Sequence, residues 1–521
     1  MQPSLLPIGI QDFATIRANN FYYADKTFLI NQLLTGGRNY FLSRPRRFGK
    51  SLLLDTIRCV FEGKECLFEG LCIHDQWDWS ETYPIVRLSF GAKYTEPGDL
   101  NRSILSKLRL VERASDLELA DSITTGPERL ETIIQNLFLS TGKPVVVLVD
   151  EYDKPILDTL DRPEQALANR DYLRGFYGVI KDCAEYVRFV FVTGVSMFSK
   201  VSLFSGLNNL QNISLDSRYA TLCGYTDHDL DTVFAPMLEG IDRKDVRDWY
   251  NGYNWLGREK VYNPHDVLLL LDNRTFEAHW FETATPTFLY DTFAKNSIGL
   301  AEVHNARVDK RALIRFDVQD IGLQALMFQS GYLTITDEYR EGIHTSYHLT
   351  YPNREVKESL NAGLLEYFGV SDSERRIQTH VLTEYLRSKD FEGFARTFQS
   401  WVAGIPYQWH MQNDFARHEA WYKSLLCMCL SAQNIDLRME EASRFGRADV
   451  VIVMDDTICI VEFKMASKLD DAEAALDRAL MQIREQDYAA KYKHLNQPVY
   501  LIGMACDEEA RNLLAVRVEE I

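Results

Sequence analysis

The sequence predicts an α/β protein with several domains, and three observations support this fold class. A short strand, a Gly-Lys-Ser loop and a helix follow one another near residue 50. Two continuous apolar runs end in polar residues near positions 150 and 194, and two more flank an acidic turn near 455. The chain has 521 residues, enough for about three domains of ~150 residues each.

Composition excludes several classes of protein. The 57 basic and 75 acidic residues give a formal net charge of −18, so any contact with nucleic acid must come from local basic patches. The nine cysteines contain no Cys-x-x-Cys pair, so neither structural zinc nor a disulfide framework is expected. No apolar run reaches the ~18 residues of a membrane span. We therefore expect a cytoplasmic protein without membrane association.

The first element is a phosphate-binding loop between a strand at Asn39 to Ser43 and a helix from Ser51 to Phe61. In such a loop backbone N–H groups hold the phosphates, Lys50 reaches the β and γ oxygens, and Ser51 binds Mg²⁺. Arg44 stands where the usual pattern has glycine. The expected nucleotide-binding residues are Arg44, Pro45, Arg46, Arg47, Phe48, Gly49, Lys50 and Ser51.

Two later strands add to this site. The apolar run from Val145 to Val149 is typical of a central strand covered on both faces, and Asp150 and Glu151 follow it. There Asp150 would hold Mg²⁺ and Glu151 would polarise the attacking water. A second run ends at Thr193, which suits a sensor of the γ-phosphate. Each run alone could be an ordinary buried strand, but their order favours an ATPase with ATP and Mg²⁺ as cofactors.

Several residues of this domain allow two interpretations. Arg46 and Arg47 bind phosphate, or they pair with acids such as Asp25; we expect at least one of them at the nucleotide. The segment from Tyr23 to Lys26 either covers the adenine or packs as a strap. The candidates for an arginine finger are not distinguished from one another: Arg170, Arg174 and Arg188.

A predicted hairpin near the C-terminus carries a second candidate site. If Met454 pairs with Thr457 across the acidic turn, antiparallel counting places Asp449 opposite Glu462. Lys464, two residues further on, then lies on the same face as Glu462.

Two acids and a lysine on apolar strands are costly unless a metal or a ligand compensates them. Metal-assisted phosphodiester hydrolysis requires such a set. Asp449 and Glu462 would hold Mg²⁺ or Mn²⁺, and Lys464 would stabilise charge or position the nucleophile. Glu419, at the start of a helix, could supply a third acid, and Gln482 lies on a downstream helix. The alternative is a set of solvated strand-end residues.

These stretches resemble, in order along the chain, the AAA-ATPase-like proteins that carry a C-terminal PD-(D/E)xK nuclease domain. In that family the loop also reads Arg-Pro-Arg-Arg-Phe-Gly-Lys-Ser, so the resemblance makes Arg44 a family trait. Ala448 stands before Asp449 where the nuclease motif has proline, a position that varies in the superfamily. The other matching stretches are Asp150 to Pro155, Gly446 to Asp449, Glu462 to Lys464, and Gln482-Ile483.

The resemblance implies a P-loop NTPase domain at 1–222, a mainly helical middle domain at 223–400, and a PD-(D/E)xK nuclease-like α/β domain at 401–521. A helix and hairpin in the middle domain would suit either a winged helix that docks DNA or protein, or a plain connector. The expected function is nucleotide-regulated, metal-dependent cleavage of DNA or RNA by a homo-oligomer, in defence against phage or mobile elements or in DNA processing. The alternative is a nucleotide-switched signalling or scaffold protein whose nuclease fold binds without cutting.

Overall fold

The chain forms two compact units in a computed structural model. One unit comprises residues 1–279 and 307–354, and the other comprises residues 280–306 and 355–521. The described residues are 5–197, 207, 209–279, 289–290, 292–293, 306–314, 316–317, 320–342, 344–367, 372–405, 419–430, 435–467, 471–507 and 512–521. Among the described helices, none combines the length and apolar character that a membrane span needs.

The first unit is built on a parallel five-stranded sheet in the order β2-β3-β4-β1-β5. The strands are β1 (Asn39–Ser43), β2 (Ile85–Ser89), β3 (Val145–Asp150), β4 (Val187–Gly194) and β5 (Gln211–Asn212). Every residue of β3 is buried, as expected for a central strand with helices on both faces. The strands β1, β3 and β4 confirm the three that the sequence predicts.

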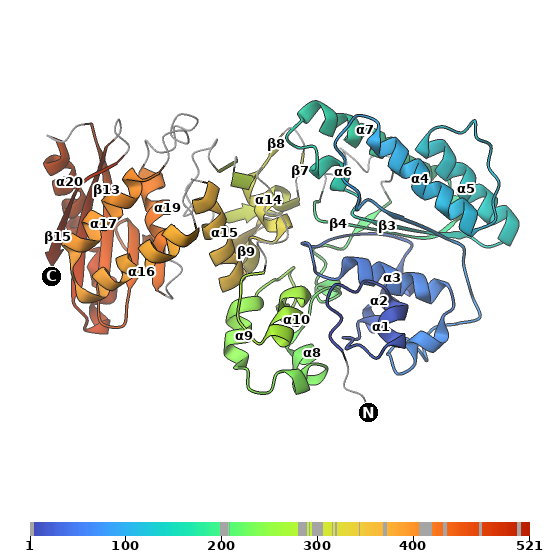
Figure 1. Cartoon of the computed structure of the whole chain (residues 1–521), viewed down its shortest axis with the longest axis horizontal. Helices are drawn as coiled ribbons and strands as arrows, with labels where there is room; N and C mark the ends of the chain where they lie inside the picture. The colour runs from blue at the N-terminus through green and yellow to red at the C-terminus, as the bar shows by residue number, and fades with distance from the viewer. Residues whose placement is uncertain are drawn as a thin grey trace. The chain divides into compact units, whose positions relative to one another are not determined.

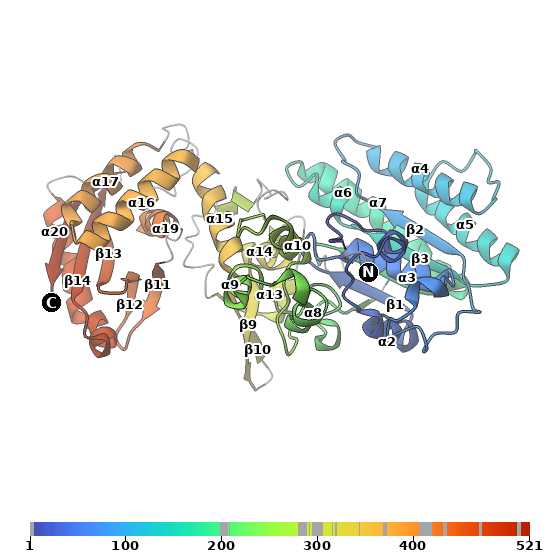
Figure 2. The same ribbon diagram turned by 60° about the horizontal axis from the view of Figure 1, so that its bottom comes forward.

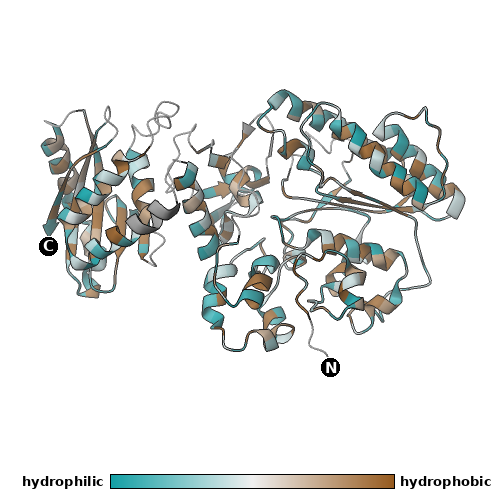
Figure 3. Cartoon of the chain, in the orientation of Figure 1, coloured by the Kyte–Doolittle hydropathy of each residue, from teal (hydrophilic) through white to brown (hydrophobic). Residues whose placement is uncertain are grey.

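Helices cover both faces of this sheet, with α1, α2 and α3 on one side and α4, α5 and α7 on the other (Figure 1). Their bounds are α1 (Phe13–Ala18), α2 (Thr27–Gly36), α3 (Lys50–Phe61), α4 (Asp99–Ala114), α5 (Gly126–Thr141), α6 (Lys154–Leu157) and α7 (Pro163–Asp182). Figure 3 shows hydrophobic residues along the strands and two-coloured helices, the pattern of a layered α/β core.

The rest of the first unit is a small helical group followed by a β-sheet. The helices are α8 (Asp227–Thr232), α9 (Arg243–Tyr250) and α10 (Pro264–Asn273). Tyr250 and Tyr262 are buried in their core, and Ile8 and Tyr22 from the N-terminal segment pack against it. The later elements are β6 (Arg307–Asp309), α13 (Lys310–Ile314), β7 (Phe316–Asp317), β8 (Asp320–Ile321), α14 (Leu323–Ser330), β9 (Thr334–Glu341) and β10 (His344–Thr350).

The second unit contains a five-stranded sheet in the order β11-β12-β13-β14-β15, in which only β13 and β14 among the neighbouring pairs are parallel. Its strands are β11 (Asp436–Ala442), β12 (Arg447–Val453), β13 (Ile458–Ala466), β14 (Val499–Asp507) and β15 (Leu513–Glu520). The helices α15 (Arg354–Tyr367), α16 (Asp372–Ser388), α17 (Phe391–Ala403), α19 (Glu419–Leu430) and α20 (Ala472–Glu485) accompany it (Figure 2).

Short 3-10 helices complete the two units: η1 (Glu65–Phe68), η2 (Ala184–Tyr186), η3 (Ser217–Tyr219), η4 (Ala235–Met237) and η9 (Tyr488–Leu495).

The expected domain boundaries do not coincide with this division. The boundary after residue 222 lies inside the first unit, and the one after residue 400 falls within α17. The side-chain amide of Gln399 on α17 donates to the carbonyl of Leu513 on β15 at 2.7 Å. The C-terminal unit therefore includes helices that precede residue 401, because they pack on its sheet.

Candidate active sites

The Gly-Lys-Ser loop joins β1 to α3 as the sequence predicts. Gly49 caps the start of α3 with a φ of +88°, a conformation that glycine adopts without steric cost. Lys50 is buried, and its Nζ donates to the carbonyls of Arg44 at 2.9 Å and Pro45 at 2.8 Å. Burial lowers the pKa of Lys50. The loop thus folds around an ammonium group, which is the cation that a phosphate-binding loop needs.

Side chains from three adjoining segments meet beside this loop. The hydroxyl of Ser51 donates to Oδ2 of Asp150 at 2.5 Å, and the hydroxyl of Thr193 donates to Oδ1 of the same carboxylate at 2.8 Å. Asp150 ends β3 and Thr193 belongs to β4, so the expected metal ligand and the expected sensor lie together. The side-chain oxygens of Ser51 and Asp150 are the kind of ligand that Mg²⁺ prefers.

Glu151 follows Asp150 in a strained backbone conformation. Its φ of +53° is unusual for a residue with a side chain and costs on the order of 1 kcal/mol. Burial, and then the charge of Asp150, raises the pKa of Glu151. A carboxylate with a raised pKa is a better proton acceptor, as the expected role in activating water requires.

Asp153 orders the segment after β4. Its Oδ2 accepts the backbone N–H groups of Val195 at 3.0 Å and Ser196 at 2.5 Å. Burial raises the pKa of Asp153. Sequence reasoning assigned this residue no role, although it links the end of β3 to the loop that follows the expected sensor.

The side chain of Arg44 points into the protein, and its expected place at the nucleotide stays a prediction. Its guanidinium donates to the carbonyls of Ser43 at 2.8 Å, Ser214 at 2.9 Å and Tyr219 at 3.2 Å. The same group lies 4.0 Å from the ring centroid of Trp255. Arg44 therefore contributes its carbonyl, the acceptor for Lys50, to the loop.

The other side chains of the loop differ in how far they are buried. Phe48 is buried, with its ring 4.7 Å from that of Tyr253, so its side chain also belongs to the core. Arg47 is exposed and contacts Nε2 of His265, while Arg46 is half-buried. Oδ1 of Asp25 accepts the N–H of Thr27, the first residue of α2, at 2.8 Å.

A small cavity in this unit adjoins the loop. It has a volume of about 80 Å³. Its walls come from the loop, from α3 and from the N-terminal segment, and they include Phe48, Gly49, Leu52, Tyr22, Tyr23 and Lys26. The segment from Tyr23 to Lys26 thus lines a cavity beside the phosphate loop. It is also a strap, because Nζ of Lys26 lies 2.5 Å from Oδ2 of Asp229 on α8.

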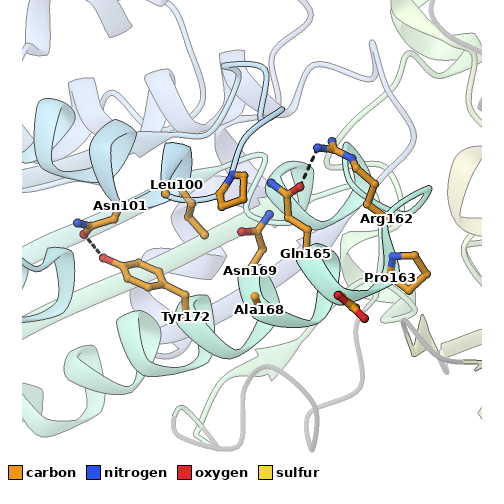
Figure 4. Close-up of a pocket in the computed structure, with 11 residues that line it drawn as sticks. Leu100, Asn101, Arg162, Pro163, Gln165, Ala168, Asn169 and Tyr172 are labelled. Atoms are coloured by element: carbon orange, nitrogen blue, oxygen red, sulfur yellow. Dashed lines mark hydrogen bonds between the residues drawn. The ribbon is translucent and has the colours of Figure 1, made fainter.

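The larger cavity, of about 730 Å³, lies between the first turns of α4 and α7 (Figure 4). Asp99 and Glu164 occupy those first turns, so both helix starts already carry negative charge. Arg162 at its rim donates to Gln165 at 2.7 Å. Its lining residues do not include the phosphate loop. Of these two cavities, only the smaller one adjoins the phosphate loop.

The C-terminal hairpin has the register that the sequence predicts. The N–H of Met454 donates to the carbonyl of Thr457 at 2.9 Å, and Val450 pairs with Val461. Asp449 therefore lies opposite Glu462. Both side chains are buried, at 5% and 1% exposure.

The two carboxylates are held by the strands themselves. Oδ2 of Asp449 accepts the N–H of Phe463 at 2.8 Å, and Oε2 of Glu462 accepts the N–H of Asp449 at 3.3 Å. Burial, and then the charge of Asp449, raises the pKa of Glu462 to about 7. Burial also raises the pKa of Asp449. Two adjacent buried acids resist ionisation together, so the pair favours a cation.

Lys464 and Glu419 lie at the same place. Nζ of Lys464 is 3.1 Å from Oε1 of Glu462 and 3.9 Å from Oε2 of Glu419. Glu419, the first residue of α19, also accepts the N–H of Met465 at 3.3 Å. The structure thus brings the expected third acid to the hairpin.

Gln482 reaches the site through a tyrosine. Its side-chain amide donates to the hydroxyl of Tyr488 at 3.4 Å, and that hydroxyl donates to the carbonyl of Arg447 on β12 at 2.7 Å. Gln482 therefore lies beside the strand that carries Asp449.

Lys423 is a member of this cluster that sequence reasoning missed. Its Nζ lies 2.5 Å from Oδ1 of Asp449 and 2.9 Å from Oε1 of Glu440. Burial alone would lower the pKa of Lys423, but the charges of Asp449 and Glu440 raise it above its usual range. The one available signal was its position, a single helical turn after Glu419.

Comparison with known proteins identifies the family of the chain and of the two domains that carry these sites. Residues 7–204 match the family model described as "Predicted AAA-ATPase", and residues 417–515 match that of the "PD-(D/E)XK nuclease superfamily". A relative from Azotobacter chroococcum mcd 1, "Uncharacterized protein in vnfD 5'region", is 45% identical over 523 residues and covers 100% of both chains. The chain belongs to the AAA-ATPase-like family with a C-terminal PD-(D/E)XK nuclease domain. No solved structure matches it.

The acids of the nuclease domain of this AAA-ATPase-like protein fit a metal that needs few protein ligands. Within the described ranges, no group of three or more His, Cys, Asp or Glu side chains is placed so that it could hold a metal ion. Mg²⁺ typically binds through one or two carboxylates and completes its shell with water and phosphate oxygens. Asp449 and Glu462, adjacent and buried, provide such a pair.

The candidate arginine fingers have different surroundings in the ATPase domain. Arg170 and Arg174 both pair with Asp171, at 2.9 Å and 3.1 Å. Arg188 lies over the ring of Tyr83. None of these contacts involves the phosphate loop, so the identity of any finger remains a prediction.

Proposed function

We propose that this AAA-ATPase-like protein couples ATP binding and hydrolysis to metal-dependent cleavage of DNA. One observation carries the proposal: the buried Asp449 and Glu462 carboxylates lie side by side with Lys464 at 3.1 Å. Burying two like charges is unfavourable unless a cation joins them. Such a cation, with a phosphodiester in its shell, makes this a hydrolytic site.

For the nuclease half, Asp449 and Glu462 would hold Mg²⁺ or Mn²⁺ and Glu419 would complete the acidic set. The bound metal would polarise the phosphate and lower the pKa of a water molecule. Lys464 would stabilise the developing charge or position the nucleophile. Gln482, through Tyr488, would fix the strand that carries Asp449.

For the ATPase half, Lys50 would face the β and γ oxygens while Ser51 and Asp150 hold Mg²⁺. Glu151 would activate the attacking water, and Thr193, already hydrogen-bonded to Asp150, would register the γ-phosphate. Arg46 or Arg47 would add charge near the phosphates.

The proposed substrate is DNA, with RNA as a second possibility, and the proposed active form is a homo-oligomer. A net charge of −18 opposes binding of a polyanion. A second subunit would therefore help to build a binding surface. We propose defence against phage or mobile elements as the setting, on family resemblance alone.

A second candidate function has one observation in its favour. Lys423 and Lys464 already pair with Asp449 and Glu462, so each of these two carboxylates has a cationic partner without a metal. A nuclease fold stabilised in this way could bind nucleic acid without cutting it and serve a nucleotide-switched scaffold.

Plasmid cleavage by the full-length protein tests the proposal and separates the two functions. We expect nicking in Mg²⁺ or Mn²⁺, none in EDTA, and none for Asp449→Asn. Asp455→Asn, an identical change at an exposed turn residue of the same hairpin, should cut like the wild type. Metal-supported DNA binding without any cutting would instead favour the scaffold.

A further inference from the structure

The ammonium group of Lys423 occupies the approach to the nuclease acids. Backbone N–H groups take one oxygen of each acid, Oδ2 of Asp449 and Oε2 of Glu462. The remaining oxygens, Oδ1 and Oε1, are those that a metal would use. Nζ of Lys423 is 2.5 Å from Oδ1, and Nζ of Lys464 is 3.1 Å from Oε1. Each metal-facing oxygen therefore already has a cationic partner.

Lys423 also has a second acidic partner, Glu440, besides Asp449. Counting along the β11–β12 and β12–β13 pairs places Glu440, Asp449 and Glu462 on one line across three strands. Lys423 contacts the first two of these acids, and Oε1 of Glu440 is 2.9 Å from its Nζ. Glu440 is 34% exposed, so it can accept the ammonium in a more solvated position.

We propose that Lys423 is a resident cation of the nuclease site, which holds Asp449 in the metal-free state and must move toward Glu440 before a divalent ion binds. The inference rests on the proposed nuclease function. Nζ of Lys423 and a divalent cation cannot both lie against Oδ1 of Asp449, because two cations at one oxygen repel each other, so the ammonium must withdraw when the ion binds. Lys423 is then a positioning residue that sets the metal concentration at which the site fills.

The proposal gives opposite expectations for two variants. Lys423→Met keeps the apolar stem and removes the competing charge, and removing one member of a close charge pair typically changes binding by about tenfold or more. We expect Mn²⁺ to bind on the order of tenfold more tightly to this variant. Glu440→Gln removes the negative charge toward which Lys423 withdraws, so it should bind Mn²⁺ more weakly than the wild type.

Calorimetric titration of the full-length protein with Mn²⁺, at fixed pH and ionic strength, tests this. Lys493→Met, the same change at an exposed lysine of the same unit, should bind like the wild type. The heat of Mn²⁺ binding that is lost in Asp449→Asn is the heat of binding at the nuclease site. Thermal melting gives a second readout: Lys423→Met should melt lower than the wild type in EDTA and gain more from Mn²⁺.

The outcomes separate this inference from the function on which it rests. Asp449-dependent Mn²⁺ binding that is equal or weaker in Lys423→Met would overturn the role of Lys423 and leave the nuclease proposal standing. If neither the wild type nor Lys423→Met binds Mn²⁺ in an Asp449-dependent manner, both proposals fail. Tighter binding in Lys423→Met with weaker binding in Glu440→Gln supports the resident cation.

Discussion

At the scale of single residues, both candidate sites depend on charges that are kept out of water. Lys50 is held by two carbonyls of its own loop, and Asp449 and Glu462 are held by backbone N–H groups of the opposite strand. Such groups are costly to bury unless they are paired. Their substitution should therefore affect ligand binding as well as stability, and the direction of each effect can be stated.

Two substitutions in the ATPase site should separate binding from hydrolysis. Lys50→Ala removes the charge that faces the β and γ oxygens, so it should abolish tight ATP binding. Glu151→Gln should still bind ATP but hydrolyse it at least about 100-fold more slowly, since general-base catalysis typically contributes that much or more. Fluorescent-nucleotide titration and phosphate release measure the two effects. Equal nucleotide affinity in the wild type and Lys50→Ala would contradict the assigned site.

The raised pKa of Glu462 predicts a pH-dependent stability in the metal-free protein. An acid whose pKa is higher in the folded state binds its proton more tightly there, so its contribution to stability falls as the pH rises from about 4.5 to about 7. Glu462→Gln cannot ionise and should lose less stability over this range. Melting in EDTA at pH 5 and pH 8 measures the difference, with Asp455→Asn as the control. An unchanged pH dependence in Glu462→Gln would refute the shift.

At the scale of secondary-structure elements, the segment after β3 and the end of β4 pack without spare room. A Cβ atom on Gly194 would lie 2.4 Å from the ring of Tyr152 and 2.6 Å from Oδ1 of Asp153. Gly194 also follows Thr193, so the close contact lies beside the expected γ-phosphate sensor. The approach of these segments therefore requires glycine at position 194.

A matched pair of glycine substitutions tests that packing. Gly194→Ala should lower the free energy of unfolding by about 1–3 kcal/mol, the usual cost of overpacking. Gly178→Ala, on α7 where a Cβ would meet nothing within 4 Å, should raise it by roughly 0.5–1 kcal/mol through helix propensity. Urea denaturation gives both values. The packing argument fails if the two changes shift stability in the same direction.

The strands of the C-terminal sheet show which features the sequence could predict and which it could not. The hairpin register followed from a two-residue turn between apolar runs, because the turn leaves one natural pairing of Met454 with Thr457. The strands β11 and β15 were not predicted, since both are edge strands with charged residues such as Arg438 and Arg517. Edge strands carry such charges to prevent further pairing, and this hides their strand pattern.

The positions of two side chains, those of Arg44 and Lys423, could be found only from the folded structure. Arg44 has the same charge as Arg46 and Arg47, and only the buried carbonyls that surround it decide that its guanidinium faces inward. A lysine on an amphipathic helix normally lies on the solvated face. Only the packing of α19 on β12 and β13 brings Lys423 to Asp449.

At the scale of the whole molecule, the proposed ATPase and nuclease sites belong to different compact units of one chain. Any coupling between them must pass through the chain or through assembly. Because the protein is strongly acidic, we expect nucleotide to act by assembling subunits into a surface that can hold DNA.

A non-hydrolysable ATP analogue should therefore increase the sedimentation coefficient of the full-length protein and raise its rate of plasmid cleavage. Lys50→Ala should show neither response, while Lys493→Met should behave as the wild type. Sedimentation velocity and a cleavage time course at equal protein concentration measure both. Cleavage that proceeds equally fast with and without nucleotide would exclude this form of gating.

The division of the chain into two units has a further consequence. The polypeptide passes from one unit to the other three times, after residues 279, 306 and 354. A single cut at the second crossing, after residue 306, therefore gives two fragments that each contain residues of both units. For the same reason, a deletion or recombination at one point cannot remove either unit whole, and each interrupts the coding sequence of the other.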